Sequence, residues 1–421
     1  MTPLPGPSQA GGPHRSRQPG QRRRAAHAAP RHARTGGRCH SRTATATMAG
    51  TAAFISFAVV ILAAAAPIAA ARTVHHAIGH VRHQRPTHRR VVSHSPIGPV
   101  CPLTGELAPG GAVPHRPALA VKVDNYPTAR PQSALNQADI VFEEPVEGAI
   151  TRLVAVFQCS SPSLIGPVRS AREPDVAIAD ELSHPLLVHA GGINPILALL
   201  NAANLTNIDV VFQYSNLTVH PSGRYAPYDT YVSARSMWNL APSDTTPPAP
   251  LFSYRAAVPD GGTTTSSVHI PFSSTSDVTW TWVPGSSDWQ LSYAGQPATT
   301  LSGSTIDGSP APVAAANVVA MHVHTFSGPW VENSLGAHEV EVHATGSGPV
   351  VVLRNGVAIS GTWRRSSLSS PMVLVDRSGA TIPLAPGVTW VELVPSGIPI
   401  TTAAPAGSGS TAGSSGSTPA G

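Results

Sequence analysis

The sequence predicts an α/β or α+β first domain followed by a small all-β second domain. Between residues 101 and 242, short apolar runs of strand length alternate with stretches of helical character, which is typical of layered folds. From about residue 266 the pattern changes to short strand-like runs separated by turn signals, which indicates a barrel or sandwich. Residues 243–265 are broken by Pro, Gly and Thr and are predicted to be a linker.

The composition supports folded cores and argues against nucleic-acid binding by the folded domains. The 421 residues are 41% hydrophobic, whereas 43 Pro and 37 Gly imply a large share of loop. The first 100 residues hold 14 of the 27 Lys and Arg residues and none of the 22 Asp and Glu residues, so the rest has a net charge of −9. Phosphate contacts need a basic face, which this acidic part does not offer.

The N-terminal segments predict a membrane attachment. Residues 1–47 are Arg-, His-, Pro- and Gly-rich, and we expect a disordered basic arm whose charge sets topology rather than binding nucleic acid. Residues 48–71 carry no charge over 24 residues, enough to cross a membrane. Because arginines precede this segment, the arm should stay in the cytoplasm and the later residues should lie outside it. The long arm favours a retained single-pass signal anchor, although the small residues before Arg72 also fit a cleaved signal peptide and secretion.

Residues 72–100 form a linker with six histidines between His75 and His94. This tract could bind a transition metal, but a flexible basic tether on anionic headgroups or wall polymer is the simpler interpretation. We therefore predict no metal and no cofactor. The expected partners are the cytoplasmic membrane and cell-wall polymer or peptidoglycan fragments.

The first domain, residues 101–242, contains four expected strands and two expected helices. Pro174 and Pro195 suit the first turns of the helices. The strands are expected at 118–123, 140–142, 153–157 and 186–189, and the helices at 175–182 and 194–201.

The second domain, residues 266–395, contains only expected strands, joined by turns at 354–356, 377–379 and 386–387. The strands are expected at 278–283, 317–324, 338–343, 350–353, 372–375 and 389–393. The tail, residues 396–421, consists largely of Gly, Ser, Thr, Ala and Pro and is predicted to be disordered.

A stretch from residue 138 to residue 172 concentrates charge in a chain that is only 12% charged. It places carboxylates and guanidiniums on both sides of a short buried strand. Either these groups form a structural network of ion pairs, or they form a pocket for a polar ligand. Its charged members are Asp139, Glu143, Glu144, Glu147, Arg152, Arg169 and Arg172.

Polar residues that follow two expected strands extend this candidate site. Asp124 and Asn125 follow one strand and His189 ends another, so they would share one rim if the two strands are parallel. Arg169 and Arg172 would lie on one side if their turn opens a helix, and together they would suit a carboxylate or phosphate. The candidate ligand-binding residues are Asp124, Asn125, Arg130, Glu147, Arg152, Arg169, Arg172 and His189.

Whether the protein is an enzyme stays open. Glu143 and Glu147 could act as acid and base on a glycan, although that needs a defined separation. The candidate catalytic residues are Glu147, Asp124, Glu143 and His189. A zinc site would need His322, His324 and His343 to converge, and exposed strand histidines are the simpler interpretation.

Two of the three cysteines, Cys101 and Cys159, follow the hydrophobic segment. Outside the cytoplasm they could form a disulfide, and the alternative is two buried thiols.

Several motifs resemble the YerB-like lipoproteins, a bacterial family defined by a domain of unknown function, DUF3048. In the first domain they are CPLTG (101–105), KVDNYPTARPQ (122–132), ADIVFEEPVEGAITR (138–152), GPVRSAR (166–172) and HAGG (189–192). In the second they are ANVVAMHV (316–323), NG (355–356), GTW (361–363) and LAPGVTWVELVP (384–395). The resemblance implies a two-domain, envelope-attached, extracytoplasmic protein and brings no established activity. The chain departs from the family in its hydrophobic segment and long linker in place of a lipid anchor, and in Cys159.

Two functional hypotheses follow. The first is a binding module for an anionic or polyhydroxyl ligand of the envelope, held by Arg152, Arg169 and Arg172. The second is an envelope glycan or ester hydrolase or transferase with Glu147 or Asp124 as general base. A protein scaffold without a small ligand is a third possibility.

Overall fold

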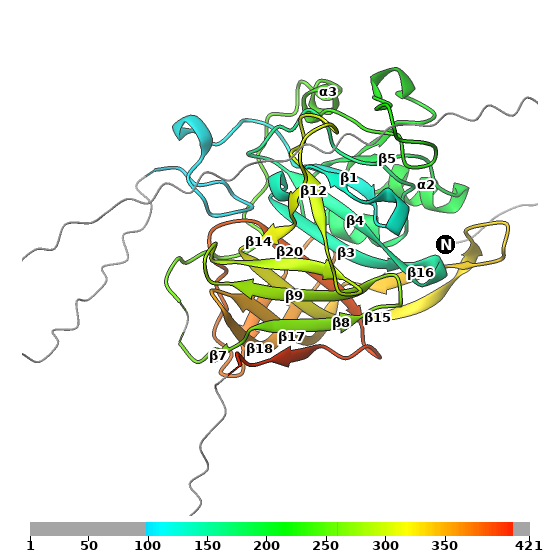
Figure 1. The fold of residues 1–421 in the computed structure, drawn as a ribbon. Coiled ribbons are helices and arrows are strands. Elements are labelled where there is room, and N and C mark those ends of the chain that lie inside the picture. Colours follow the sequence, from blue (N-terminus) through cyan, green and yellow to red (C-terminus); the bar gives the residue numbers. More distant parts are fainter. Residues whose placement is uncertain (1–97, 259, 407–421) are drawn as a thin grey trace, which may run out of the picture. The chain divides into compact units, whose positions relative to one another are not determined.

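The computed structural model describes residues 98–258 and 260–406. The expected cytoplasmic arm, the hydrophobic segment and nearly all of the His/Arg linker lie outside the described residues. The described residues belong to one compact unit. They are mostly β-sheet with few helices (Figure 1).

A 12-stranded mixed sheet, the central sheet, dominates the fold (Figure 1). Its strands run in the order β19-β18-β17-β15-β20-β3-β4-β1-β5-β6, while β16 pairs with β15 and β7 pairs with β18. The strands are β1 (Leu119–Asp124), β3 (Ile140–Val146), β4 (Ile150–Phe157), β5 (Leu186–His189), β6 (Thr206–Asp209), β7 (Thr263–Thr264), β15 (Asn317–Val331), β16 (His338–His343), β17 (Gly346–Arg354), β18 (Val357–Arg365), β19 (Val373–Asp376) and β20 (Thr389–Pro395).

Strand β20 joins the two halves of the central sheet. It lies between β3 and β15 and runs parallel to both. The register places Glu392 of β20 beside Glu143 of β3. The sheet is therefore continuous from the first part of the chain to the last, and its middle is built from distant segments.

Two smaller sheets complete the β structure. One has six strands in the order β11-β10-β9-β8-β21, with β14 beside β10, and the other has three in the order β13-β12-β2. Their strands are β2 (Gln132–Ser133), β8 (Ser267–Pro271), β9 (Asp277–Val283), β10 (Asp288–Tyr293), β11 (Gln296–Pro297), β12 (Thr299–Leu301), β13 (Ala311–Pro312), β14 (Ala314–Ala315) and β21 (Thr401–Ala403).

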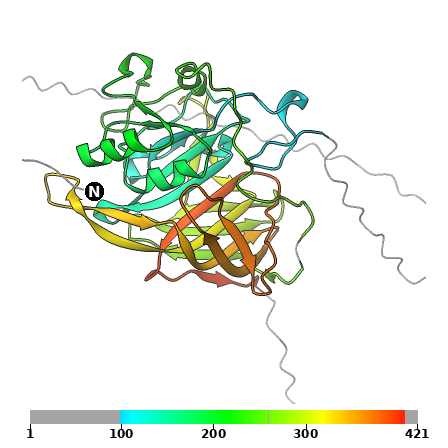
Figure 2. The same cartoon turned by 180° about the vertical axis from the view of Figure 1, so that it is seen from behind.

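Each face of the central sheet has its own core, because successive side chains of a strand point to opposite faces. On one face, Ala120 and Val154 pack with apolar residues of α1 (Pro174–Asp180) and α2 (Asn194–Ala202). On the other face, Val121 and Leu153 pack with the six-stranded sheet and with α3 (Ala234–Trp238). We call these faces the helix side and the sheet side; Figure 2 shows the helices from behind.

The sheet-side core rests on buried tryptophans. The rings of Trp280 in β9 and Trp390 in β20 meet edge to face with centroids 5.2 Å apart. Both side chains have no exposed surface. Burying rings of this size contributes a large share of the apolar area that fixes the six-stranded sheet against the central one.

The expected elements are found at most of the predicted places. The first part has the expected strands and both helices, and the second is all β. The turn between β17 and β18 has φ of 50° at Asn355 and 74° at Gly356, as a two-residue hairpin with positive φ requires.

The prediction of a disordered tail was wrong for its first residues. Thr401–Ala403 forms β21 and pairs antiparallel with β8. The polar composition hid this strand, because an edge strand that is exposed at every position has no apolar alternation to reveal it.

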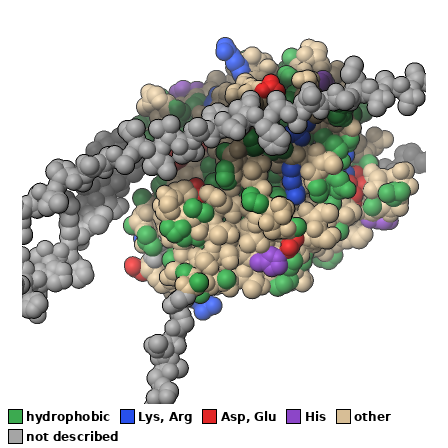
Figure 3. Space-filling model, in the orientation of Figure 1, with side chains coloured by type: hydrophobic (Ala, Val, Ile, Leu, Met, Phe, Trp, Pro, Cys, Tyr) green, Lys and Arg blue, Asp and Glu red, His purple; other side chains and the backbone are tan. Residues whose placement is uncertain are grey.

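The surface of the molecule is poor in charge on the face seen in Figure 3, where Lys and Arg side chains are few and scattered. Among residues 98–258 and 260–406, no helix combines the length and the hydropathy that a membrane span requires.

Candidate functional site

The charged stretch folds into the β3–β4 hairpin and the segment after it. Strand β3 extends to Val146, and Glu147 opens the short 3-10 turn Glu147–Ala149 that leads into β4. Because side chains alternate along β3, Glu144 points to the helix side and Glu143 to the sheet side. The stretch therefore contributes to two separate groups of charges rather than one.

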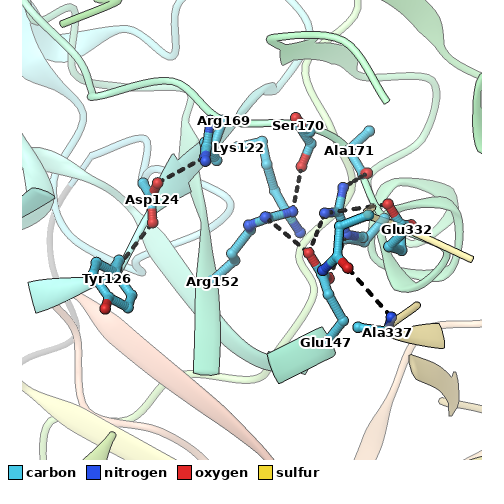
Figure 4. Close-up of polar contacts among 12 residues, drawn as sticks. Lys122, Asp124, Tyr126, Glu147, Arg152, Arg169, Ser170, Ala171, Glu332 and Ala337 are labelled. Atoms are coloured by element: carbon cyan, nitrogen blue, oxygen red, sulfur yellow. Dashed lines mark hydrogen bonds and ion pairs between the residues drawn. The ribbon is translucent and has the colours of Figure 1, made fainter. Parts of the chain in front are cut away.

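The helix-side cluster contains nine charged residues. Its members are Lys122, Asp124, Glu144, Glu147, Arg152, Arg169, Arg172, Asp175 and Glu332. Figure 4 shows its central ion pairs, with Glu147 beside Arg152 on one side and Asp124 beside Arg169 on the other.

The innermost part of the helix-side cluster surrounds Lys122, the one lysine of the chain. Its Nζ donates to Glu144 Oε1, and to Asp175 Oδ1 at 2.6 Å, with all three side chains buried. Burial raises the pKa of Glu144 to about 7, although the charge of Lys122 opposes this shift. One ammonium between two buried carboxyls is a structural arrangement, because it leaves no surface open to a ligand.

Glu147 is held by two arginines. Arg172 donates from Nε to Oε2 at 2.7 Å and from Nη2 to Oε1 at 2.5 Å, and Arg152 Nη2 lies 3.3 Å from Oε1. Burial opposes ionisation, but the hydrogen bond and charge of Arg172 and the charge of Arg152 outweigh it and keep the pKa of Glu147 below its usual range. Arg172 Nη2 also lies 3.2 Å from Glu332 Oε2 on β15's hairpin. The Nε and Nη2 groups of Arg172 thus both contact carboxylates of the protein itself.

Arg169 lies at the solvent-facing end of the cluster. Its Nε forms an ion pair with Asp124 Oδ2 at 2.8 Å, and Asp124 Oδ1 accepts the backbone N–H of Tyr126 at 2.9 Å. The Arg169 side chain is 29% exposed, while Asp124 is 2% exposed. Nη1 and Nη2 of Arg169 donate no hydrogen bond to any of the described residues. Asp124 orients the guanidinium from its Nε side, so the Nη1 and Nη2 groups can donate to an anion from solvent.

Tyr228 borders Arg169, and Tyr126 stacks with Tyr228. The Arg169 guanidinium carbon lies 5.9 Å from the ring centroid of Tyr228. The rings of Tyr126 and Tyr228 are nearly parallel, with an angle of 6° and centroids 6.3 Å apart.

The condition under which Arg169 and Arg172 would lie on one side, that their turn opens a helix, is not met. Helix α1 begins at Pro174, and residues 169–172 before it have no regular secondary structure. The two arginines therefore reach different carboxylates, Asp124 and Glu147, instead of forming one fork-like pair.

A second group of charged and polar residues lies on the sheet side, and we call it the sheet-side cluster. It contains three further candidates, Glu143, Asn125 and Arg130. Glu143 Oε1 accepts from Thr151 at 2.6 Å, and Oε2 accepts from Tyr293 at 2.8 Å. Asn125 donates to Glu143 Oε1 at 3.1 Å. Arg130 lies over the Tyr293 ring at 3.6 Å and donates to Asn125 Oδ1 at 3.2 Å.

Glu392 lies beside Glu143 and completes the sheet-side cluster. Its Oε1 accepts from Trp280 Nε1 at 2.7 Å, whereas its Oε2 is buried and has no hydrogen-bond partner among the described residues. Burial raises the pKa of both carboxyls, and the charge of Glu143 raises that of Glu392 further. Because Glu143 has no exposed surface and faces Tyr293, it cannot act with Glu147 on one glycan.

His189 lies at the rim expected for it but is not available to a ligand. Strands β1 and β5 are parallel, which was the condition for Asp124 and His189 to share one edge of the sheet. The ring of His189 is fully buried, and its nitrogens contact Gly191 O at 2.9 Å and Asn207 Oδ1 at 2.7 Å. His189 is therefore part of the packing behind the rim.

Cys101 and Cys159 form a disulfide with an S–S distance of 2.04 Å. His324 lies opposite His343 across the β15–β16 pair. Within residues 98–258 and 260–406, no group of three or more His, Cys, Asp or Glu side chains is arranged to hold a metal ion.

Several contributing residues escaped the sequence analysis, among them Tyr126, Tyr228, Glu332 and Glu392. Tyr228 and Glu332 lie far from the charged stretch in sequence, so no local signal marks them. Glu392 did carry a signal, because it is the single charged residue in the buried strand TWVELV.

Family models match both parts of the chain. The N-terminal domain of the DUF3048 proteins of unknown function matches residues 103–246, and the C-terminal domain matches residues 268–391. The chain belongs to the DUF3048 family.

A curated relative and a solved structure agree with this family. The protein named "Putative lipoprotein YerB" of Bacillus subtilis (strain 168) is 29% identical over 300 residues, covering 70% of this chain and 86% of the relative. The crystal structure of the Bacillus subtilis YerB protein superposes with a TM-score of 0.60 at 24% identity, covering 72% of this chain and 99% of that chain. At this identity the structural likeness shows the fold alone.

Proposed function

We propose that this DUF3048 protein is an extracytoplasmic, envelope-attached binding module that holds an anionic envelope polymer at Arg169. The name of the Bacillus relative supports attachment to a membrane. The uncharged segment 48–71 would supply that attachment here. The wall polymer outside the membrane is then the abundant anionic partner within reach.

The observation that carries the proposal is the difference between Arg169 and its neighbours. Arg152 and Arg172 are 5% and 6% exposed and contact Glu147, whereas Arg169 is 29% exposed with both Nη atoms free among the described residues. Asp124 fixes the orientation of Arg169 without occupying its fork. Such preorganisation lowers the ordering entropy that an anion would otherwise have to overcome on binding.

The hydrolase or transferase alternative gains no support from the same geometry. A general base needs a free lone pair near the substrate, but both oxygens of Glu147 accept from arginine. Asp124 is similarly occupied by Arg169 and by the N–H of Tyr126.

Thermal unfolding of the purified full-length chain in detergent tests the proposal. Solubilised wall fragments at a hundred times their dissociation constant should stabilise the protein by about 2.7 kcal/mol. Arg169→Ala should abolish this shift. The matched control is Arg364→Ala, which removes an exposed arginine from β18, far from β1 in the strand order. An equal shift in both variants would refute an Arg169 site.

A further inference from the structure

We propose that the ligand at Arg169 is an acidic carbohydrate, whose carboxylate or phosphate meets the Arg169 fork while a sugar ring packs on Tyr126 and Tyr228. This inference rests on the proposed function and adds the chemical class of the ligand. It starts from the exposed ring of Tyr126 and the half-buried ring of Tyr228 beside the Arg169 guanidinium, which an inorganic anion would not use.

The tyrosines are placed to receive a flat apolar surface. Tyr126 is 40% exposed, and its ring is parallel to that of Tyr228 within 6°. A pyranose ring presents a face of C–H groups with hydroxyls at its edge. That face can pack on an aromatic ring while the edge hydroxyls bond to phenol and guanidinium groups.

The pair of tyrosines is held by the protein before any ligand binds. Tyr126 directly precedes the 3-10 turn Pro127–Ala129, and Tyr228 lies in the long loop after β6. Arg224 of that loop donates to Ala129 O at 3.2 Å and to Pro131 O at 2.5 Å. This clamp joins the two segments that carry the rings.

Arg169 and the tyrosines form one surface because Asp124 connects them. The carboxylate of Asp124 contacts Arg169 Nε with one oxygen and the backbone N–H of Tyr126 with the other (Figure 4). The positions of the charge and of the apolar face are therefore fixed relative to each other. A ligand that carries both features within one sugar unit matches this arrangement better than an extended acidic peptide, whose carboxylates lie on flexible side chains.

The test is isothermal titration calorimetry on the full-length chain in detergent. The probes are an oligogalacturonate, a sugar phosphate, a neutral oligosaccharide, acetate, inorganic phosphate and hexaglutamate. We expect the oligogalacturonate or the sugar phosphate to bind at least tenfold more tightly than any other probe. The better of these two identifies carboxylate or phosphate as the anionic group. Equal binding of hexaglutamate, or of the free anions, would overturn the carbohydrate assignment.

Variants distinguish the carbohydrate inference from the proposed function, which needs only an anion site at Arg169. Tyr126→Ala and Tyr228→Ala should each weaken acidic-sugar binding at least tenfold, whereas Tyr225→Ala, which removes an 80% exposed ring of the same loop, should change it less than twofold. Tyr228→Phe keeps the ring and should bind nearly as the parent does, which guards against a folding defect. If all anions lose affinity in Arg169→Ala but the tyrosine variants bind normally, the Arg169 site stands and the carbohydrate inference fails. If no probe responds to Arg169→Ala, the proposed function fails as well.

Discussion

On the helix side of the central sheet, Glu147 lies between Arg152 and Arg172, whereas on the sheet side Glu143 and Glu392 lie side by side on neighbouring strands. The pKa of Glu147 is lowered by its arginines, and the pKa values of Glu143 and Glu392 are raised by burial. Two buried acidic sites, separated by one layer of backbone, thus have pKa values shifted in opposite directions.

The difference shows what a buried carboxyl needs in order to stay charged. A bidentate arginine supplies both charge and directed donors, and it offsets the loss of water. On the sheet side the donors to the carboxyls are neutral ones from Asn125, Thr151, Tyr293 and Trp280, with Arg130 as the cation acting on Glu143. Neutral donors and one cation near Glu143 do not offset the burial of two adjacent carboxyls, so the pKa values of both are raised.

The largest expected effect comes from removing a partner on the charged side. Arg172→Ala should lower the free energy of unfolding by about 3–5 kcal/mol, because it leaves Glu147 and Glu332 buried with too little positive charge. Denaturant unfolding at neutral pH measures this loss.

A second substitution tests the cause. Adding Glu147→Gln to Arg172→Ala should recover part of the lost stability, since the uncompensated charge is removed. If Arg172→Ala costs less than about 1 kcal/mol, water reaches this site and the contrast between the two faces is smaller than the structure indicates.

An intermediate effect is expected from Glu392→Gln on the sheet side. The amide oxygen can still accept from Trp280, and the repulsion between Glu143 and Glu392 is gone. A carboxyl whose folded pKa is raised contributes stability that is complete below its unfolded pKa of about 4.3 and is lost as the pH rises through the folded pKa.

The free energy of unfolding of Glu392→Gln should therefore increase relative to that of the parent protein as the pH rises. Between about pH 5 and the folded pKa, its stability relative to the parent should increase by about 1.4 kcal/mol per pH unit, measured by denaturant unfolding at a series of pH values. Raised carboxyls away from the Glu143–Glu392 pair, Asp139 and Glu144 among them, are common to both proteins and cancel in the difference. A difference that does not change with pH would mean that Glu392 is already ionised in the folded state.

The sequence predicted where these acidic residues gather, but it did not predict that they lie on opposite faces of the central sheet. The strand predicted at 140–142 ends before Glu143, so the alternation that sends Glu143 and Glu144 to opposite faces was missed. Had the strand been extended to Val146, the period of two would have predicted the split.

Other features of the fold were beyond local patterns. The apolar runs at β1, β4 and β15 predicted strands correctly, because buried strands need β-branched and apolar residues. The insertion of β20 between β3 and β15 depends on pairing across more than 200 residues, and the contact of Tyr228 with Arg169 is equally non-local. No periodicity within a strand or loop records such neighbours.

The smallest effect on stability is expected at Arg169, where the contrast between a structural and a ligand-binding arginine is sharpest. Arg169→Gln should cost about 1 kcal/mol or less, because the side chain is 29% exposed and water can replace it beside Asp124, which keeps the N–H of Tyr126. Denaturant unfolding, run in parallel with Arg172→Gln, measures the difference. Equal losses in the two variants would make Arg169 part of the structural network. A small loss for Arg169→Gln together with lost binding of the anionic polymer would separate the arginine that holds a ligand from those that hold the fold.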